Sequence, residues 1–264
     1  MTTPPSSLSG GFLPSPRSPA SSDASTSNSA SGSPLPHPRN HPLRAGSSKE
    51  EAARRFVEGR LLHVSRRYTK KFQPLEPGDA VKGYESIKEA CKDLSEVIDV
   101  LWLSGTPSLQ IPYLMNVALS LTTYLSAFPP SPAPTFALLR KLDHAFASLL
   151  YGEDVSTGEP LPGLDAGGNS GMSRTDMVRC KSLVQSTRVQ IVDVMSKEPE
   201  EDGDKETEED TEMDDANAQG ETDWEMNEGD DEYEMDVARV YEKTIIQLNS
   251  ALGTDTGYEA GNGS

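Results

Sequence analysis

Six side chains in this sequence have the types that most readily supply nucleophilic, acid–base or metal-binding chemistry. They are His37, His41, His63, His144, Cys91 and Cys180. The two cysteines lie far apart in the chain, so they do not form the closely spaced Cys pair of a structural zinc site. Each lies within an apolar helical pattern, which is typical of a buried, reduced thiol and not of a disulfide. We therefore expect no metal and no cofactor.

Catalytic motifs are also missing from the sequence. Neither the G-x-S-x-G pattern of a serine nucleophile nor the G-x-x-x-x-G-K-[ST] pattern of a phosphate-binding loop occurs. The glycine-rich residues 167–171 have no lysine after them and no strand before them, so they indicate a linker. His144 directly follows Asp143, but an imidazole at the surface or rim of a helix explains this pair better than a catalytic pair does. The sequence predicts a protein that is not an enzyme.

The negative charge of the chain is concentrated in one segment. The formal net charge is -18, yet the tract from Glu198 to Glu234 holds twenty Asp and Glu against one basic residue, Lys205. The remainder of the chain is therefore close to neutral. A polyanionic tract repels nucleic acid, so direct nucleic-acid binding is not expected. The tract is also the basis of an alternative function, that of an acidic chaperone for histones or other basic nuclear proteins.

The feature that most favours a binding function is a basic helix face near residue 60. Between Lys49 and Phe72 there are eight Lys and Arg against three Glu. The candidate partner-binding residues on this face are Arg55, Arg66, Arg67 and Lys70. One interpretation is a docking surface for an acidic partner or for the chain's own acidic tract. A plain solvated helix face, a nuclear import signal at residues 66–71 and direct DNA contact remain open as alternatives.

Aromatic residues within the acidic tract form a second candidate contact. Trp224 and Tyr233 are surrounded by Asp and Glu in "TDWEMNEGDDEYEMD". In such segments charge steers the encounter with a basic surface, while the ring supplies an apolar anchor. The alternative is a linker that only solvates the chain.

The periodicity of the apolar residues predicts an all-α helical bundle of about five helices over residues 48–196. The expected helices cover 48–72, with Ser48 and Glu51 as a capping box, then 81–103, 109–128, a fourth helix that begins after a stiff proline-rich link at 129–134, and 173–196. The second helix has an apolar seam at steps of three and four, as coiled-coil helices do. The third is apolar on every face and is expected to be surrounded by the others. Gly152 is expected to end the fourth helix, and residues 153–171 to form a mobile loop.

The rest of the chain has the composition of tails and linkers. Residues 1–47 are predicted to be a disordered Ser/Pro-rich tail with kinase-type sites at Ser15, Ser18 and Ser33, so the protein is expected to be phosphorylated. Residues 197–234 and 254–264 are also predicted to be disordered. A short amphipathic helix is expected at 235–253, and it either docks back on the core or binds a partner's groove. No secretory signal or membrane-spanning segment is expected.

Three stretches of the core resemble a fungal family associated with subunit 11 of the general transcription factor TFIIH. They are "ACKDLSEVIDVLWLSGTPSLQIPYLMNVAL", "YLSAFPPSPAPTFALLRKLDHAFASLLYGED" and "MSRTDMVRCKSLVQSTRVQIVDVM". The resemblance covers about residues 50 to 196 and includes no reactive motif. It implies a nuclear, non-enzymatic accessory subunit, a monomer within the complex, with TFIIH subunits as its partners. It also implies binding to the DNA translocase subunit of TFIIH and promotion of its dissociation from the complex.

Overall fold

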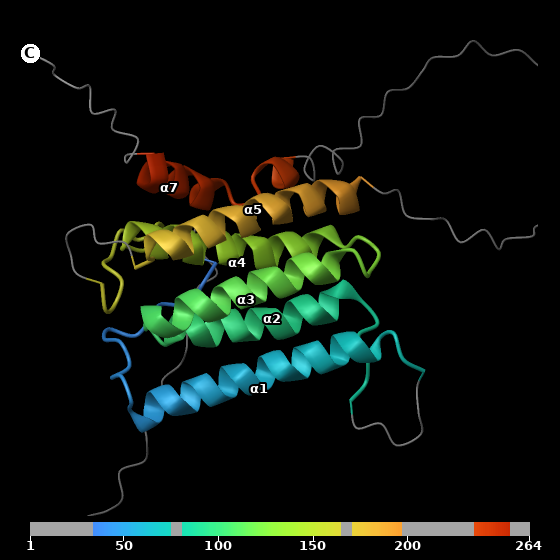
Figure 1. Ribbon diagram of the computed structural model, residues 1–264, viewed down its shortest axis with the longest axis horizontal. Helices are drawn as coiled ribbons and strands as arrows, with labels where there is room; N and C mark the ends of the chain where they lie inside the picture. Colours follow the sequence, from blue (N-terminus) through green and yellow to red (C-terminus); the bar gives the residue numbers. More distant parts are fainter. Residues whose placement is uncertain (1–33, 75–80, 165–170, 197–234, 254–264) are drawn as a thin grey trace, which may run out of the picture. The chain divides into compact units, whose positions relative to one another are not determined.

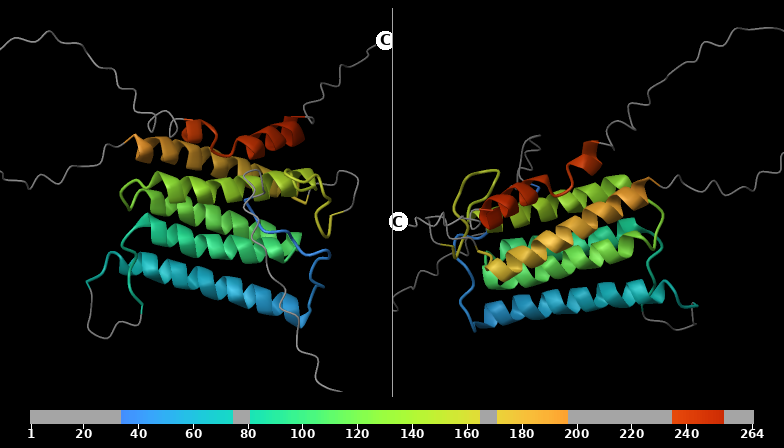
Figure 2. Two further views of the ribbon diagram at one scale, coloured as in Figure 1. Left: turned by 180° about the vertical axis from the view of Figure 1, so that it is seen from behind. Right: turned by 45° about the horizontal axis from the view of Figure 1, so that its top comes forward.

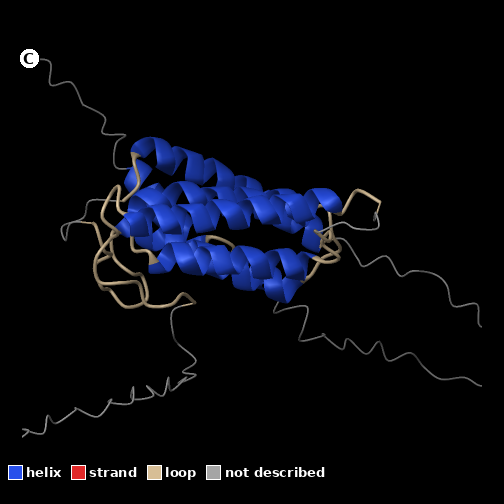
Figure 3. Ribbon diagram, turned by 90° about the horizontal axis from the view of Figure 1, so that it is seen from below, coloured by secondary structure: helices blue, strands red, loops and turns tan. Residues whose placement is uncertain are grey.

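The structure is a computed structural model that describes residues 34–74, 81–164, 171–196 and 235–253. All of these residues belong to one compact unit. Within them the regular structure is helical, as predicted, with a single isolated bridge between Glu153 and Pro160 (Figures 1 and 3). The helices are α1 (Ser48–Lys70), α2 (Ile87–Leu103), α3 (Pro107–Leu125), α4 (Pro132–Tyr151), α5 (Arg174–Met195) and α7 (Glu242–Gly253).

The helices pack in two layers. In one layer α2 lies between α1 and α4, and α4 lies between α2 and α7. Helix α3 packs on α2 and α5, so α3 and α5 make the second layer (Figures 1 and 2). This arrangement leaves α1 and α7 as the two outer helices of the first layer.

Helix α2 has the buried seam that its sequence predicts. The six seam residues are all buried: Tyr84, Ile87, Cys91, Leu94, Ile98 and Leu101. The expectation that α3 is enclosed on every side is wrong for one face, because Leu119 is exposed. The reason is that α3 packs mainly on α2 and α5, which leaves its outer face uncovered.

Several predicted helix starts differ from the observed ones. Ser47, not Ser48, is the N-cap of α1: its Oγ accepts from the Glu50 N–H at 3.2 Å, while the Glu50 carboxylate accepts from the Gly46 N–H at 2.6 Å. This is a variant of the capping box, one residue earlier than expected, in which the carboxylate accepts from the residue before the N-cap. Helix α2 starts after Ser86 and not at residue 81.

The late start of α2 has a steric cause. A Cβ on Gly83 would lie 2.8 Å from the Lys71 N atom, so the backbone of residue 83 packs directly on the end of α1. The Tyr84 N–H donates to the Arg67 carbonyl at 3.3 Å. Residues 81–86 therefore run across the end of α1, and α2 begins only after them.

The termini of the remaining helices follow local signals. Helix α3 has Thr106 as its N-cap and Pro107 in its first turn, so Pro112 lies inside the helix and not in the first turn. Gly152 ends α4 in the left-handed conformation with φ 88°, as predicted. Ser173 caps α5 by accepting from the Asp176 N–H at 3.2 Å, also as predicted.

Two segments expected to lack order pack on the core instead. Residues 34–47 were assigned to the disordered tail, yet Leu35 and Leu43 are buried, and the Leu43 N–H donates to Thr106 Oγ1 at 2.9 Å. Residues 153–164 were assigned to a mobile loop, yet Asp154 and Leu161 are buried. In both segments a few well-placed residues make the contacts, and such sparse anchors leave no periodic signal in the sequence.

Residues 235–253 dock back on the core, which decides between the two alternatives for the amphipathic helix. They form one helical turn at 235–238, followed by α7. Helix α7 packs on α4 and α5 (Figure 2). The other predicted tails and the acidic tract, residues 1–33, 197–234 and 254–264, lie outside the described residues.

Candidate protein interface

The inner edge of α1 carries arginines that bind α2. Arg67 donates from Nη1 to Asp93 Oδ2 at 3.1 Å and also pairs with Glu89. Arg60 donates from Nη2 to Asp93 Oδ1 at 3.4 Å and also pairs with Glu96. Because these guanidinium groups bind carboxylates of the same chain, Arg67 has a structural role, and its predicted contact with a partner stays a prediction.

Tyr84 completes this charge network. Its hydroxyl donates to Asp93 Oδ2 at 2.8 Å, and the Arg67 guanidinium lies 4.1 Å from the centre of its ring. Burial, followed by the hydrogen bond to Asp93, raises the pKa of Tyr84, so the phenol remains a donor. Asp93 therefore accepts from three side chains, and it joins α1 to α2.

The outer face of α1 combines basic and apolar side chains. Arg55, Leu62 and Arg66 are spaced seven and four residues apart, which places them on one helix face. Leu62 is 51% exposed and Phe56 is 46% exposed, while Arg55 and Arg66 are also exposed. Among the described residues, Arg55 pairs with Glu51 on its own helix, at 3.4 Å. We call Arg55, Phe56, Leu62 and Arg66 the outer α1 face.

The outer α1 face differs from the predicted basic face in two ways. It keeps the predicted residues Arg55 and Arg66, while Lys70 is half-buried near the helix end. It adds Leu62 and Phe56, which the sequence reasoning missed. The signal for Leu62 was present, because the inward apolar stripe of the helix runs through Leu61 and Val64, and Leu62 lies outside it. The two predicted aromatic anchors, Trp224 and Tyr233, lie outside the described residues.

An aromatic cluster lies at the C-terminal end of α1. The rings of Tyr68 and Tyr124 are stacked with centroids 3.9 Å apart, and Phe72 packs edge-on against Tyr68 at 5.3 Å. Lys71 Nζ lies 4.8 Å from the centre of the Phe128 ring and 5.1 Å from that of Phe72. Because Phe72 is exposed, this end of α1 also presents a cation beside an aromatic ring.

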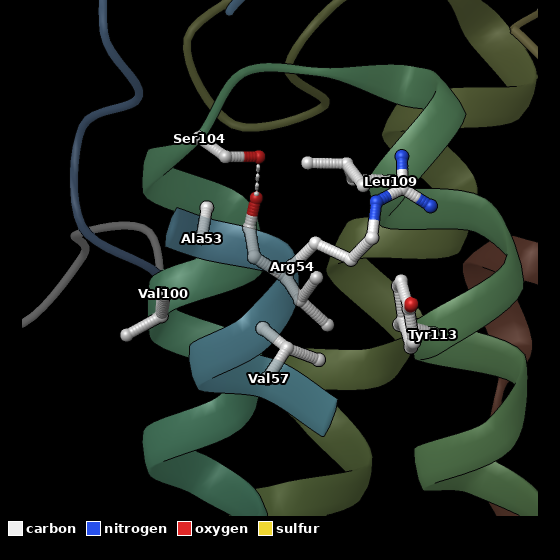
Figure 4. Close-up of a pocket in the computed structure, with 8 residues that line it drawn as sticks. Ala53, Arg54, Val57, Val100, Ser104, Leu109 and Tyr113 are labelled. Carbon is white, nitrogen blue, oxygen red and sulfur yellow. Dashed lines mark hydrogen bonds between the residues drawn. The ribbon is translucent and has the colours of Figure 1, made fainter. Parts of the chain in front are cut away.

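The opposite end of α1 is closely packed. Figure 4 shows the small cleft where Val57 of α1 faces α2 and α3, with Leu109 and Tyr113 on the α3 side. The space left in the cleft is too small for a water molecule. Ser104 Oγ donates to the Leu101 carbonyl at 2.6 Å at its edge. This cleft holds α1 in place and offers no room for a ligand.

The most chemically suggestive cluster is built around His144, which the sequence analysis placed at the surface or rim. His144 is instead 1% exposed. Its Nε2 lies 3.2 Å from Asp154 Oδ2, its Nδ1 lies 3.2 Å from Ser156 Oγ, and the ring packs edge-on to Trp102. The side chain is buried because the 153–164 segment folds over α4, a contact between segments that the local sequence does not reveal.

A serine, a histidine and an aspartate in contact are the set used for nucleophilic catalysis, but here they close a turn. The Asp154 carboxylate also accepts from the Ser156 and Thr157 N–H groups at 2.8 and 3.2 Å. A general base must reach a proton of the substrate, and a buried imidazole does not. Burial lowers the pKa of His144, against the raising effect of Asp154, which favours the neutral ring. The cluster therefore fixes the 153–164 segment.

A cavity of about 330 Å³ lies beside this turn, between the N-terminal segment and the 153–164 segment. His37 Nε2 lies 3.0 Å from Glu159 Oε2 across it. The cavity is lined by His37, Pro38, Arg39, Asn40, Asp154, Glu159, Pro160, Leu161 and Pro162. Since Asp154 is engaged within the turn, the cavity wall presents an exposed ion pair and prolines and no set of converging catalytic groups.

Other reactive groups in the described part of the chain are either buried or isolated. Burial raises the pKa of both Cys91 and Cys180 to about 12, so both thiols stay protonated. Both cysteines are free. Among the residues that the structure describes there is no group of three or more His, Cys, Asp or Glu that could hold a metal ion. None of the described helices is long and apolar enough to cross a membrane.

Comparison with known proteins gives two findings. An uncharacterized protein of Schizosaccharomyces pombe is 25% identical over 201 residues, which cover 74% of this chain and 91% of that protein. No solved structure matches. A family model described as subunit 11 of the general transcription factor TFIIH matches residues 83–249.

The family match differs in extent from the predicted one. It begins at Gly83, where the chain packs on the end of α1, and it extends through the acidic tract into α7. The resemblance seen in the sequence had instead started near residue 50 and stopped at 196. Helix α1 and its outer face therefore lie outside the matched region. The match spans well over half of the sequence, and the chain belongs to the family of subunit 11 of the general transcription factor TFIIH.

Proposed function

We propose that this protein is a non-enzymatic accessory subunit of TFIIH that binds the DNA translocase subunit and promotes its dissociation from the complex. The observation that carries the proposal is the family match over residues 83–249. TFIIH is a nuclear transcription factor, so the family implies a nuclear location and a role in transcription. The buried state of His144 and of both cysteines agrees with a role in binding and not in catalysis.

The outer α1 face is the proposed contact with the partner. It presents Leu62 between Arg55 and Arg66 on one helix face, and Phe56 is exposed about a quarter turn around the helix. Apolar side chains supply the energy of a protein interface, while arginines at its edge select an acidic partner surface. Trp224 and Tyr233 in the acidic tract are the proposed second and weaker contact.

Dissociation requires a difference in affinity. The protein must bind the released translocase more tightly than the translocase held in TFIIH, because equal affinity for both states shifts no equilibrium. The proposed role therefore predicts that the outer α1 face, or the tract, binds a translocase surface that is less accessible within the complex.

The test is a release assay with the full-length protein. TFIIH is immobilised through a core subunit, the protein is added, and the translocase subunit in the supernatant is measured. We expect release by the wild type and at least about tenfold less by the Arg55→Glu, Arg66→Glu double variant, because charge reversal opposes an acidic partner. The matched control is Arg179→Glu, an exposed arginine of α5. Absence of release by the wild type would overturn the function, and full release by the double variant would exclude the outer α1 face as the contact.

The acidic tract supports a second candidate function, chaperoning of histones or other basic nuclear proteins. Twenty acidic residues against one lysine between Glu198 and Glu234 give the charge that such chaperones use. Deletion of residues 198–234 separates the two functions. A chaperone loses histone binding on deletion, whereas the proposed subunit keeps most of its translocase binding.

A further inference from the structure

Residues 235–253 of the same chain pack on both α4 and α5 (Figure 2), and we call the surface that they cover the α4–α5 groove. Four side chains of this segment are buried there: Val240, Tyr241, Thr244 and Leu248. The Tyr241 ring packs against Phe146 of α4 at 6.2 Å. Tyr241, Thr244 and Leu248 recur at steps of three and four, which is how an amphipathic helix packs one face on a partner surface.

A buried carboxylate receives the N-terminus of α7. Asp143 of α4 accepts from the Thr244 N–H at 2.8 Å, from the Thr244 hydroxyl at 2.7 Å and from the Lys243 N–H at 3.4 Å. The N–H groups in the first turn of a helix have no partner within the helix. Asp143 supplies that partner from a different helix, so the groove recognises a helix end as well as an apolar face.

The fit of residue 241 is imperfect. Tyr241 has a φ of 56°, which is unfavourable for a residue with a side chain. Its hydroxyl is buried and has no hydrogen-bond partner in the described part of the chain. Burial raises the pKa of this phenol, so the hydroxyl stays protonated. These two features make the docked segment less stable than a segment that fitted the same surface without backbone strain and with its hydroxyl paired.

The connection to the rest of the protein does not enforce docking. Thirty-eight residues, 197–234, separate the last described residue after α5 from residue 235, and this stretch carries the acidic tract. A connection of this length is long enough that the covalent link alone does not fix where residue 235 lies. Because the two parts belong to one chain, α7 stays at a high local concentration near the groove.

We propose that the α4–α5 groove is a reversible helix-binding site, occupied in the free protein by α7 and in a complex by an amphipathic helix of a protein partner. The partner helix would present free N-terminal amides to Asp143 and an apolar face in place of Leu248. The proposal does not depend on which TFIIH subunit the protein contacts. It assigns to α7 the role of an intramolecular competitor.

The experiment compares two substitutions in α7 of the full-length protein. Leu248 is 1% exposed and Ile246 is 59% exposed, so Leu248→Asp undocks α7 while Ile246→Asp leaves it docked. The probe is a fluorescent peptide of residues 235–253, and its binding is measured by anisotropy. We expect the Leu248→Asp protein to bind the peptide at least about 100-fold more tightly than the Ile246→Asp protein, because undocking removes the tethered competitor. Adding Asp143→Ala to Leu248→Asp should weaken peptide binding at least about tenfold.

Two outcomes would overturn the proposal. Equal peptide affinity of the Leu248→Asp and Ile246→Asp proteins would show that the groove does not bind a helix in trans. Loss of the cooperative thermal transition of helicity in the Leu248→Asp protein alone would show that α7 is an integral part of the core. A retained transition together with tight, Asp143-dependent binding would establish the reversible site.

Discussion

The two outer helices, α1 and α7, are attached to the central helices by different polar interactions: ion pairs hold α1, and one buried carboxylate holds α7. Helix α1 is joined to α2 by a partly buried network of ion pairs in which Asp93 accepts from Arg60, Arg67 and Tyr84. Helix α7 is joined to α4 by one buried carboxylate, Asp143, which accepts from the backbone and side chain of Thr244.

The difference predicts how each attachment responds to change. Ion pairs near the surface are screened by salt and contribute modestly, so the α1 attachment tolerates the loss of one partner. A buried polar group that loses its partner keeps its full desolvation cost, so the α7 attachment is lost as a unit. The attachment that depends on one buried carboxylate is therefore the more sensitive to a single substitution.

The largest effect is expected from Asp143→Ala. The substitution removes the acceptor for the Lys243 and Thr244 N–H groups, which destabilises the docked α7 by about 3 kcal/mol, while the Thr244 hydroxyl keeps the carbonyl of residue 143 as an acceptor at 3.1 Å. Hydrogen exchange of the full-length protein should show loss of protection in α7 and retained protection in α1. Unchanged protection of α7 would show that its attachment does not depend on Asp143.

The next effect is expected from Gly83→Ala at the α1 edge. The added methyl group would lie 2.8 Å from the Lys71 N atom, a backbone atom, so the chain must shift at a cost of about 2 kcal/mol in the free energy of unfolding. Gly59→Ala is the matched control, because nothing lies within 4 Å of its Cβ position in α1. Alanine there should stabilise the helix by about 0.5–1 kcal/mol. Urea denaturation measures both, and equal effects would contradict the packing at Gly83.

A smaller effect is expected from Asp93→Asn. The amide keeps the size of the side chain but weakens the charge-assisted bonds from Arg60 and Arg67, which lowers the free energy of unfolding by about 1 kcal/mol. The difference from the wild type should shrink in high salt, where ion pairs are screened. Asp143→Ala should show no such salt dependence. If salt did not change the loss of unfolding free energy in Asp93→Asn, the attachments of α1 and α7 would not differ in the way described.

Acidification should affect the α4 side of the molecule through His144. Burial lowers the pKa of His144 in the folded protein below its ordinary value of 6.5. As the pH falls below 6.5, the unfolded state takes up a proton that the folded state does not, so stability declines until the folded pKa is passed. His144→Gln should flatten this part of the melting temperature profile. An unchanged profile would show that His144 is not held neutral.

The smallest effect on stability is expected from the Arg55→Glu, Arg66→Glu double variant. Both side chains are exposed on the outer α1 face, so the free energy of unfolding should change by no more than about 0.5 kcal/mol. Its loss of translocase release would then report on binding alone. A large loss of stability, measured by urea denaturation, would instead place these arginines in the structural network with Arg67.

The helices were predictable because their signals are local. The seam of α2, the cap at Ser173 and the left-handed Gly152 all depend on residues within a few positions of each other. Even the errors at the ends of α1 and α2 were shifts of one and six residues, and the second was caused by Gly83 crossing α1. The family could be recognised from the same apolar pattern.

The candidate interface was only partly predictable because charged residues look alike in a sequence. Arg66 and Arg67 are neighbours of the same type, yet Arg66 is exposed and Arg67 binds Asp93. The local sequence indicates that His144 lies at the rim of its helix, whereas in the structure the 153–164 segment covers it. Asp143 lies 101 positions from Thr244, and no local pattern links the two.

The sequence by itself therefore determined the helical elements, their apolar faces and the segregation of negative charge into one tract. Periodicity and capping are properties of neighbouring residues, so they need no knowledge of the fold. Only the tertiary structure decided which charges are bound within the protein and which face outward, because a partner for a charge comes from whichever segment packs beside it. Folding placed Asp93 under α1 and Asp143 under α7, and it left Arg55, Leu62 and Arg66 exposed.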